Sequence, residues 1–247
     1  MEITAIRVER KDKKFDLFTS LQGFNYKNGD VLVVSSKFVS MSEGMVVELR
    51  KVKVSKKARA LAEKHGMEPR LAELVLQESD YLVKGVPGFV LAVRDGMIAP
   101  NAGIDKSNVR KGFAILYPRD PFASAEKLRA KFLSSGVKIG VVIADSRLMP
   151  TRIGTTGVAI ACAGIEPVED LRGKKDLFGN VLRVTLRAVA DGLATMGVAA
   201  MGESDESTPA AVVRGAKVQW TDRRISWKDM AVTPQVDIYL RGVESEL

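Results

Sequence analysis

Three acidic residues each follow an apolar segment directly, at positions where a carboxylate is unfavourable unless it faces water or a cation. They are Asp105, Asp145 and Glu203. Asp145 is followed by Ser146, and a carboxylate beside a hydroxyl is a suitable donor pair for a hard divalent metal. Each position also has a simpler interpretation when taken alone. Asp105 could form an Asx turn, Asp145 could end a strand, and Glu203 could belong to a solvated acidic loop that continues through Asp205 and Glu206.

The scarcity of histidine and cysteine restricts the remaining chemistry. The chain has one histidine, His65, and one cysteine, Cys162, so tetrahedral zinc sites and Ser/His or Cys/His triads are disfavoured. His65 precedes Gly66 at an expected helix end, and Cys162 lies in an apolar run typical of a buried thiol in a reducing compartment. No Walker or dinucleotide-binding glycine motif occurs. Carboxylates, lysines, arginines and hydroxyls must therefore carry any activity.

The net charge of +8 raises the possibility of a polyanionic partner. The basic residues are spread along the chain without an aromatic recognition motif, so an anionic small molecule explains the excess at least as well as nucleic acid does. The segment 173–180, GKKDLFGN, could bind a carboxylate or phosphate, or could be a basic turn. With no signal peptide and no membrane-length apolar stretch, we expect a cytoplasmic protein that does not bind membranes.

Strands and helices that would position these residues can be read from the apolar periodicity. The sequence predicts strands at 29–36, 113–118, 137–146 and 210–215, and a strand pair across 42–44. It also predicts a hairpin at 88–104 that turns at Asp95 and Gly96. Helices are expected within 55–79, as a pair separated by Gly66 and Pro69, over 124–136 with Ser124 as the cap, and over 183–202. Asp145 and Ser146 would then end a strand, and Arg147 would enter a loop.

This element order is neither a strict strand–helix alternation nor a helix bundle. It favours an α+β fold with mixed and antiparallel sheets, packed helices and two interleaved subdomains. No stretch rich in Gly, Pro or Ser marks a linker, so residues 1–247 are predicted to form a single domain with soft subdomain boundaries.

Several segments together resemble the archaeal coenzyme F-420 gamma-glutamyl ligase family. They follow one another in the family's order over nearly the full length: GDVLVVSSKFVS and SEG (29–44), NAGIDKSNV (101–109), GVVIADS (140–146), GVAIACAGI (157–165), RGKKDLFGNVLRVT (172–185), VADGLA (189–194), MGE (201–203) and PAAVVRG (209–215).

The resemblance implies a GTP-dependent ligase that joins L-glutamate through a gamma-linked amide to a phosphorylated deazaflavin, by way of an acyl phosphate. It also implies an intertwined homodimer and two divalent cations per site, Mg²⁺ or Mn²⁺. By match to the family motifs, Asp105 and Asp145 would hold one metal, and Ser146 and Glu203 would hold or flank the second. The same match assigns nucleotide contacts to Ser36, Lys37, Asn108, Met201, Gly202, Ser204, Asp205 and Glu206.

The sequence also departs from the family pattern near the expected nucleotide. Met41 stands where the family usually has a lysine, and the segment 10–14 is basic instead of apolar. Residues 147–152 replace a turn that contains glycine and arginine in the family, and the loop 204–207 is acidic instead of glycine-rich. Two alternatives therefore stay open. One is a relative that keeps the metal site but uses another nucleotide or acceptor, and the other is a non-catalytic binding protein with the same fold.

Overall fold

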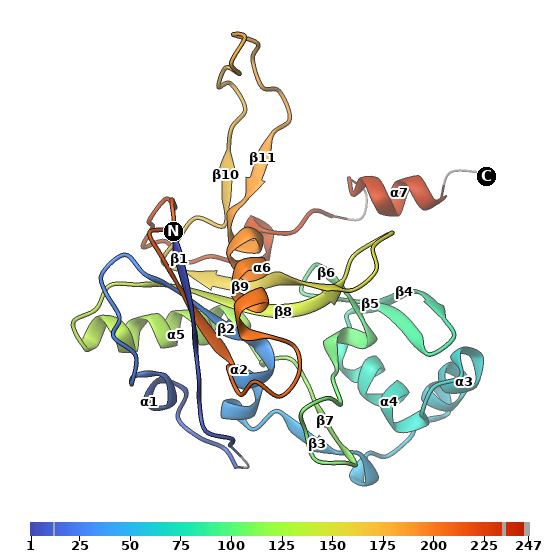
Figure 1. Cartoon of the computed structure of the whole chain (residues 1–247). Helices are drawn as coiled ribbons and strands as arrows, with labels where there is room; N and C mark the ends of the chain where they lie inside the picture. Colours follow the sequence, from blue (N-terminus) through green and yellow to red (C-terminus); the bar gives the residue numbers. More distant parts are fainter. Residues whose placement is uncertain (12, 234–235, 245–247) are drawn as a thin grey trace. The chain divides into compact units, whose positions relative to one another are not determined.

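The computed structural model describes residues 1–11, 13–233 and 236–244 (Figure 1). The chain forms two compact units. The first contains residues 1–47 and 105–225, and the second contains residues 48–104 and 226–247. The elements are strands and helices in mixed and antiparallel sheets, which confirms the predicted α+β class.

The first unit is built on a five-stranded sheet with the strand order β1-β12-β2-β8-β9. The strands are β1 (Glu2–Ile6), β12 (Ala210–Arg214), β2 (Val31–Ser35), β8 (Gly140–Leu148) and β9 (Thr155–Ala163). Only β2 and β8 are parallel; the other neighbours are antiparallel. Four successive residues of β2 are buried, because this central strand is covered on both faces and its sequence is apolar throughout.

Helix α6 (Val189–Met201) lies across this sheet, and small residues allow its backbone to approach closely (Figure 1). A Cβ atom at Gly197 would lie 2.5 Å from a methyl group of Val33, and one at Gly157 would lie 2.3 Å from the Ala194 carbonyl oxygen. The carboxylate of Asp191 accepts a hydrogen bond of 2.9 Å from the Ala159 amide, which fastens the start of the helix to β9. The loop that follows α6 is therefore placed by the core of the first unit.

Other helices of the first unit surround the same sheet. They are α1 (Leu17–Leu21), α2 (Ser36–Glu43), which follows β2 without a loop, and α5 (Pro121–Ser134), which packs against β8 and β9. Strands β3 (Val46–Glu48) and β7 (Phe113–Ile115) form a separate two-stranded sheet.

An antiparallel arm extends away from the five-stranded sheet (Figure 1). Its base pairs β10 (Val168–Asp170) with β11 (Leu186–Ala188), and residues 171–185 form the tip. The side chains of Leu177 and Phe178 at this tip are 100 % and 91 % exposed. Such apolar exposure is unusual for a side chain without a partner surface.

The second unit contains a three-stranded antiparallel sheet with the order β4-β5-β6. Its elements are η1 (Leu49–Lys51), α3 (Lys56–His65), α4 (Pro69–Glu78), β4 (Tyr81–Val86), β5 (Phe89–Arg94), β6 (Met97–Pro100), η2 (Asn101–Gly103), η3 (Trp227–Asp229) and α7 (Ile238–Glu244). Within the described residues, no helix combines the length and the apolar character needed to cross a membrane.

Most of the predicted elements are confirmed, including the paired helices, the hairpin turning at Asp95 and Gly96, and the strand over 210–215. The predicted strand pair across 42–44 is wrong. Residues 36–43 form α2, which ends at Gly44 with a φ of 79°, and β3 pairs with β7 instead of with a preceding strand. The segment forms a helix instead of a strand because the buried residues Phe38 and Val39 can pack on one helix face. Gly44, with its left-handed backbone, then ends the helix.

Three predicted boundaries are also wrong. The N-cap of α5 is Asp120, whose carboxylate accepts from the Ala123 amide, and Ser124 lies inside the helix. Helix α6 begins at Val189, because residues 186–188 pair as β11. Strand β8 continues two residues past Ser146, because residues 147 and 148 still pair with β9.

Candidate functional site

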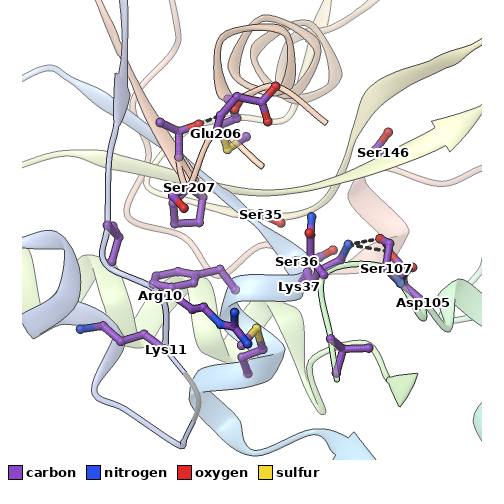
Figure 2. Close-up of a pocket in the computed structure, with 18 of the residues that line it drawn as sticks. Arg10, Lys11, Ser35, Ser36, Lys37, Asp105, Ser107, Ser146, Glu206 and Ser207 are labelled. Atoms are coloured by element: carbon purple, nitrogen blue, oxygen red, sulfur yellow. Dashed lines mark hydrogen bonds and ion pairs between the residues drawn. The ribbon is translucent and has the colours of Figure 1, made fainter. Parts of the chain in front are cut away.

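A cavity of about 1020 Å³ opens within the first unit, at the ends of β2 and β8 (Figure 2). Its walls come from residues 8–11, 13 and 14 near the N-terminus, the start of α2, the segment 105–113 and the loop after α6. All twelve residues assigned to metal or nucleotide by the family resemblance line this one cavity: Ser36, Lys37, Asp105, Asn108, Asp145, Ser146, Met201, Gly202, Glu203, Ser204, Asp205 and Glu206. The fold thus gathers residues that lie up to 170 positions apart in the sequence, from Ser36 to Glu206.

Asp145 is held by three side chains. Its Oδ2 atom accepts from the Tyr117 hydroxyl and, at 3.1 Å, from Nε of Arg147. Its Oδ1 atom accepts from the Ser36 hydroxyl at 3.1 Å. Tyr117 and Arg147 are only 6 % and 9 % exposed, so one carboxylate oxygen is held from inside the protein and the other is turned toward the cavity wall.

Tyr117 and Arg147 also contact each other, since Nη2 of Arg147 donates to the Tyr117 hydroxyl at 2.9 Å. Burial, followed by the neighbouring charge of Asp145, raises the pKa of the Tyr117 phenol above its ordinary value, so the phenol stays protonated and can donate. The prediction that Arg147 enters a loop is wrong, because alternate residues of β8 put Asp145 and Arg147 on the same side of the strand. Sequence reasoning missed Tyr117; its signal was a tyrosine closing the apolar run 113–118, since buried tyrosines need a polar partner.

Asp105 and Lys37 form an ion pair at the second side of the cavity. Nζ of Lys37 lies 2.6 Å from Oδ2 of Asp105 and donates to the Ser107 hydroxyl at 2.6 Å (Figure 2). The Ser107 amide donates to Oδ1 of Asp105 at 2.6 Å, so the simple Asx-turn interpretation also holds. Burial opposes the charge on Asp105, but the contacts with Lys37 and Ser107 together outweigh it and lower the pKa of this carboxyl.

The loop after α6 is held mainly by contacts within itself and with nearby hydroxyls. Glu203 accepts from Ser146 at 2.6 Å and from Thr155 at 3.1 Å, so hydroxyl donors offset the unfavourable position of a carboxylate near a helix C-terminus.

The Glu206 carboxylate accepts from the Ser204 amide at 2.8 Å and folds over Gly202, whose φ is 78°. Backbone amides of this loop lower the pKa of Glu206. The side-chain Nδ2 of Asn108 donates to the Ser204 carbonyl at 2.9 Å and joins the loop to the segment 105–113.

The cavity offers the carboxylate and hydroxyl oxygens that Mg²⁺ and Mn²⁺ prefer. Ser146 already joins β8 to Glu203, and Asp105 and Asp145 line the same space. Among the described residues, no three acidic, histidine or cysteine side chains are gathered closely enough to hold a metal as they stand. These oxygens are of the type that binds such a cation, but Asp105 would have to give up its ion pair with Lys37 to bind it. The assigned metal ligands therefore stay a prediction.

Comparison with known proteins gives a consistent family. A family model described as F420-0:Gamma-glutamyl ligase matches residues 3–215. A protein of Methanopyrus kandleri is 38 % identical over 221 residues, which cover 88 % of each chain. A protein of Methanothermobacter thermautotrophicus is 40 % identical over 195 residues, covering 78 % of this chain and 77 % of its own. One from Methanocaldococcus jannaschii is 38 % identical over 208 residues, covering 83 % of each chain. All three relatives are named coenzyme F420:L-glutamate ligase.

Proposed function

This chain belongs to the F420-0:gamma-glutamyl ligase family, and we propose that it joins L-glutamate to the deazaflavin coenzyme F420 or its precursor through a gamma-linked amide. The match over residues 3–215 and the names of the relatives support the ligase activity. The observation that carries the proposal is the convergence of all twelve family-assigned residues on one cavity of the first unit.

In the proposed reaction, a carboxylate of the acceptor attacks the γ-phosphorus of GTP, and GDP leaves. The acyl phosphate that forms is then attacked by the amine of glutamate, which loses a proton as inorganic phosphate departs. Lys37 and the first turn of α2 at Ser36 line the cavity, and a helix N-terminus together with an ammonium group suits a phosphate. Asn108 and the loop 202–206 would position the nucleotide, and closure of the cavity would protect the acyl phosphate from water.

Two divalent cations are part of the proposal, with Asp105 and Asp145 at one and Ser146 and Glu203 at the other. When bound, such cations neutralise charge on the phosphate oxygens. The chain's own contribution is orientation. Tyr117 and Arg147 hold one oxygen of Asp145, and Ser146 and Thr155 hold Glu203, so both carboxylates are placed before any ligand arrives. This preorganisation around a shared cavity favours an enzyme over a binding protein that merely keeps the fold.

The departures near the nucleotide support a second candidate of the same class, a ligase using another nucleotide or acceptor. Met41 lines the cavity where the family usually has a lysine, and the loop 204–207 carries two carboxylates. Incubation of the protein with the deazaflavin acceptor, glutamate, Mn²⁺ and either GTP or ATP, read by mass spectrometry for added glutamyl units, separates the candidates. Glutamyl addition with ATP but not with GTP would favour the second.

The sharpest test of the site is Asp145→Asn, which keeps the shape of the side chain and removes its charge. We expect at least a hundredfold loss of glutamyl addition, in the range seen when one electrostatic group of an active site is removed. The matched control is Asp222→Asn, an exposed carboxylate outside the cavity that pairs with Arg129, and it should leave activity unchanged. Equal activity of Asp145→Asn and the parent protein would reject the assignment.

Asparagine is preferable to alanine at this position because Arg147 is buried against Asp145. Asparagine also removes the charge, but it keeps an oxygen that can accept from Arg147 and Tyr117. Alanine would leave a guanidinium that is 9 % exposed with neither a charge nor an acceptor at residue 145, and removing one partner of a buried pair costs roughly 3–5 kcal/mol. Loss of activity in Asp145→Ala would therefore confuse catalysis with folding.

The homodimer implied by the family is also proposed. Its support is the arm, where Leu177, Phe178 and Val184 present apolar side chains to solvent in the isolated chain. Sedimentation of the parent protein should give twice the chain mass, and Phe178→Ser with Leu177→Ser should shift it toward the monomer.

A further inference from the structure

Two buried donors hold one oxygen of Asp145 and leave the other to the cavity. Oδ2 accepts from the Tyr117 hydroxyl and from Nε of Arg147, and both of these side chains are buried. Because a carboxylate oxygen has about two lone-pair sites, these donors together engage Oδ2 fully. Oδ1 accepts instead from the Ser36 hydroxyl at 3.1 Å, and Ser36 and Asp145 both line the cavity. A cation that enters the cavity would therefore meet Oδ1.

The same contacts fix the rotation of the Asp145 carboxylate. Nη2 of Arg147 also donates to the Tyr117 hydroxyl at 2.9 Å, so Arg147 positions the phenol that in turn holds Asp145. Turning the carboxylate to present both oxygens to the cavity would break the contacts at Oδ2, and breaking the hydrogen bonds of buried donors is costly. The geometry therefore favours coordination of a cation through one oxygen.

The other two acids assigned to the metals are held differently. Glu203 accepts from two hydroxyls, both on Oε1, but these hydroxyls lie at an exposed part of the cavity and can rotate away. Oδ2 of Asp105 pairs with Lys37, whose side chain is partly exposed. The donors at Oδ2 of Asp145 come from the core, so Asp145 is the carboxylate whose orientation the packing of the first unit imposes.

Divalent cations differ in how they use a carboxylate. Ca²⁺ takes about six to eight oxygens and binds carboxylates through one or both oxygens, whereas Mg²⁺ requires a nearly ideal octahedron with oxygens at about 2.0–2.1 Å. The two oxygens of one carboxylate are too close together to fill neighbouring corners of a small regular octahedron, so binding through both suits the larger ion. A carboxylate restricted to one oxygen therefore favours a small octahedral cation over Ca²⁺.

We propose that Tyr117, supported by Arg147, makes the cavity selective for small octahedral cations over Ca²⁺ by restricting Asp145 to one coordinating oxygen. This inference rests on the proposed function, which assigns a divalent cation to Asp145. Tyr117 is a positioning residue in this proposal. It does not touch the cation, but it determines which cations the carboxylate can bind.

The test removes only the Tyr117 hydroxyl. Tyr117→Phe keeps the ring in the core and releases one donor from Oδ2 of Asp145. The matched control is Tyr26→Phe, which removes the hydroxyl of a partly buried tyrosine whose hydrogen bond of 2.8 Å goes to the Leu21 carbonyl, outside the cavity. Binding of Mn²⁺ alone, without nucleotide, is measured from the electron paramagnetic resonance signal of the free ion. Ca²⁺ is then titrated as a competitor.

We expect the preference of the parent protein for Mn²⁺ over Ca²⁺ to shrink about tenfold in Tyr117→Phe, in line with the loss of one hydrogen bond to a charged group. Most of this change should be tighter binding of Ca²⁺, and Tyr26→Phe should keep the preference of the parent. Equal weakening of both ions in Tyr117→Phe would overturn the inference, because the phenol would then merely stabilise the charge on Asp145.

The measured ion must also be the one at Asp145. Asp145→Asn should weaken Mn²⁺ binding in the same assay, because it removes the charge that attracts the ion. Mn²⁺ binding that is as tight in Asp145→Asn as in the parent would place the ion elsewhere, and the inference would fail.

Arg147→Lys is a second, independent variant. Lysine keeps the positive charge, but one ammonium group cannot reproduce the fork with which Arg147 contacts both Oδ2 and the phenol. This variant should also narrow the preference for Mn²⁺, so the inference is testable even where Tyr117→Phe folds poorly. An unchanged preference in either variant, with thermal melting showing that the variant is folded, would contradict the inference.

The two proposals can fail separately. If the parent protein adds no glutamate yet prefers Mn²⁺, and this preference narrows in Tyr117→Phe, the selectivity inference stands and the ligase proposal fails. If the parent protein ligates and Tyr117→Phe keeps the preference of the parent, only the selectivity inference fails.

Discussion

The sheet side of the cavity holds Asp145 between the buried side chains of Tyr117 and Arg147, whereas the loop 202–206 holds Glu206 by exposed contacts within a few residues. Both arrangements orient a carboxylate, but they depend on different parts of the fold. The sheet side is tied to the core, so its changes should affect the stability of the first unit. The loop depends on local backbone geometry, so its changes should affect the cavity and leave global stability nearly untouched.

Arg147→Met should have the largest effect, and it tests whether the sheet side of the cavity is held by the core. The substitution removes a buried cation that contacts both Asp145 and Tyr117, and it leaves a carboxylate that has lost a charged donor. We expect a loss of roughly 3 kcal/mol in the free energy of unfolding, measured by urea denaturation. Arg172→Met is the control, because its pair with Asp170 is exposed on the arm and should change stability by less than about 0.5 kcal/mol. Similar small losses in both variants would show that the sheet side is not held from the core.

Gly202→Ala tests the loop and should have a smaller effect. Gly202 has a φ of 78°, and an added Cβ would lie 2.4 Å from the Glu206 carboxylate. The left-handed backbone and the contact should together cost about 1 kcal/mol and displace Glu206, with weaker nucleotide binding in calorimetry. The double variant Gly202→Ala, Glu206→Ala removes the clash and keeps the backbone strain. Glu206→Ala alone is the reference: if the double variant binds nucleotide more weakly than this single variant does, backbone strain at residue 202 contributes to the loss.

Lowering the pH should give the smallest effect and should act on the loop. The pKa of Glu206 is lowered by backbone amides, so its contribution is complete above the unfolded pKa of about 4.3 and is lost as the pH falls through the lower folded value. Amide exchange at Ser204, corrected for intrinsic rate, should therefore become faster below about pH 4. Glu206→Gln should abolish this pH dependence. A dependence that persists in the variant would place the titrating group elsewhere.

The parts of the fold read correctly from the sequence are those with strong local signals. The helices separated by Gly66 and Pro69 have clear periodicity and a glycine terminus, and the turn at Asp95 and Gly96 is a common hairpin sequence. The helix over 36–43 was missed because its apolar residues continue directly from those of β2, so that period 2 and period 3.6 are hard to separate over so few residues.

The candidate site shows the same limit. The residues lining the cavity were found because the family resemblance supplied their positions, while Asp105, Asp145 and Glu203 also had independent signals as acids after apolar segments. Tyr117 and the burial of Arg147 were not found, since both depend on how far β8 continues along β9 and on which strand lies beside it. Contacts between distant strands cannot be read from the sequence of either strand alone.

Strand β7 lies between the place where the chain leaves the first unit and the place where it returns. Leu116 donates to the Met45 carbonyl at 3.0 Å, and the backbone of Ile115 exchanges hydrogen bonds of 3.0 and 2.8 Å with Asp105. The inserted residues 48–104 therefore span two neighbouring anchor points, and loop-closure entropy changes only slowly with the length of an insert. A change in the length of the insert should therefore leave Asp105 in place, since the backbone of that residue is fixed by β7.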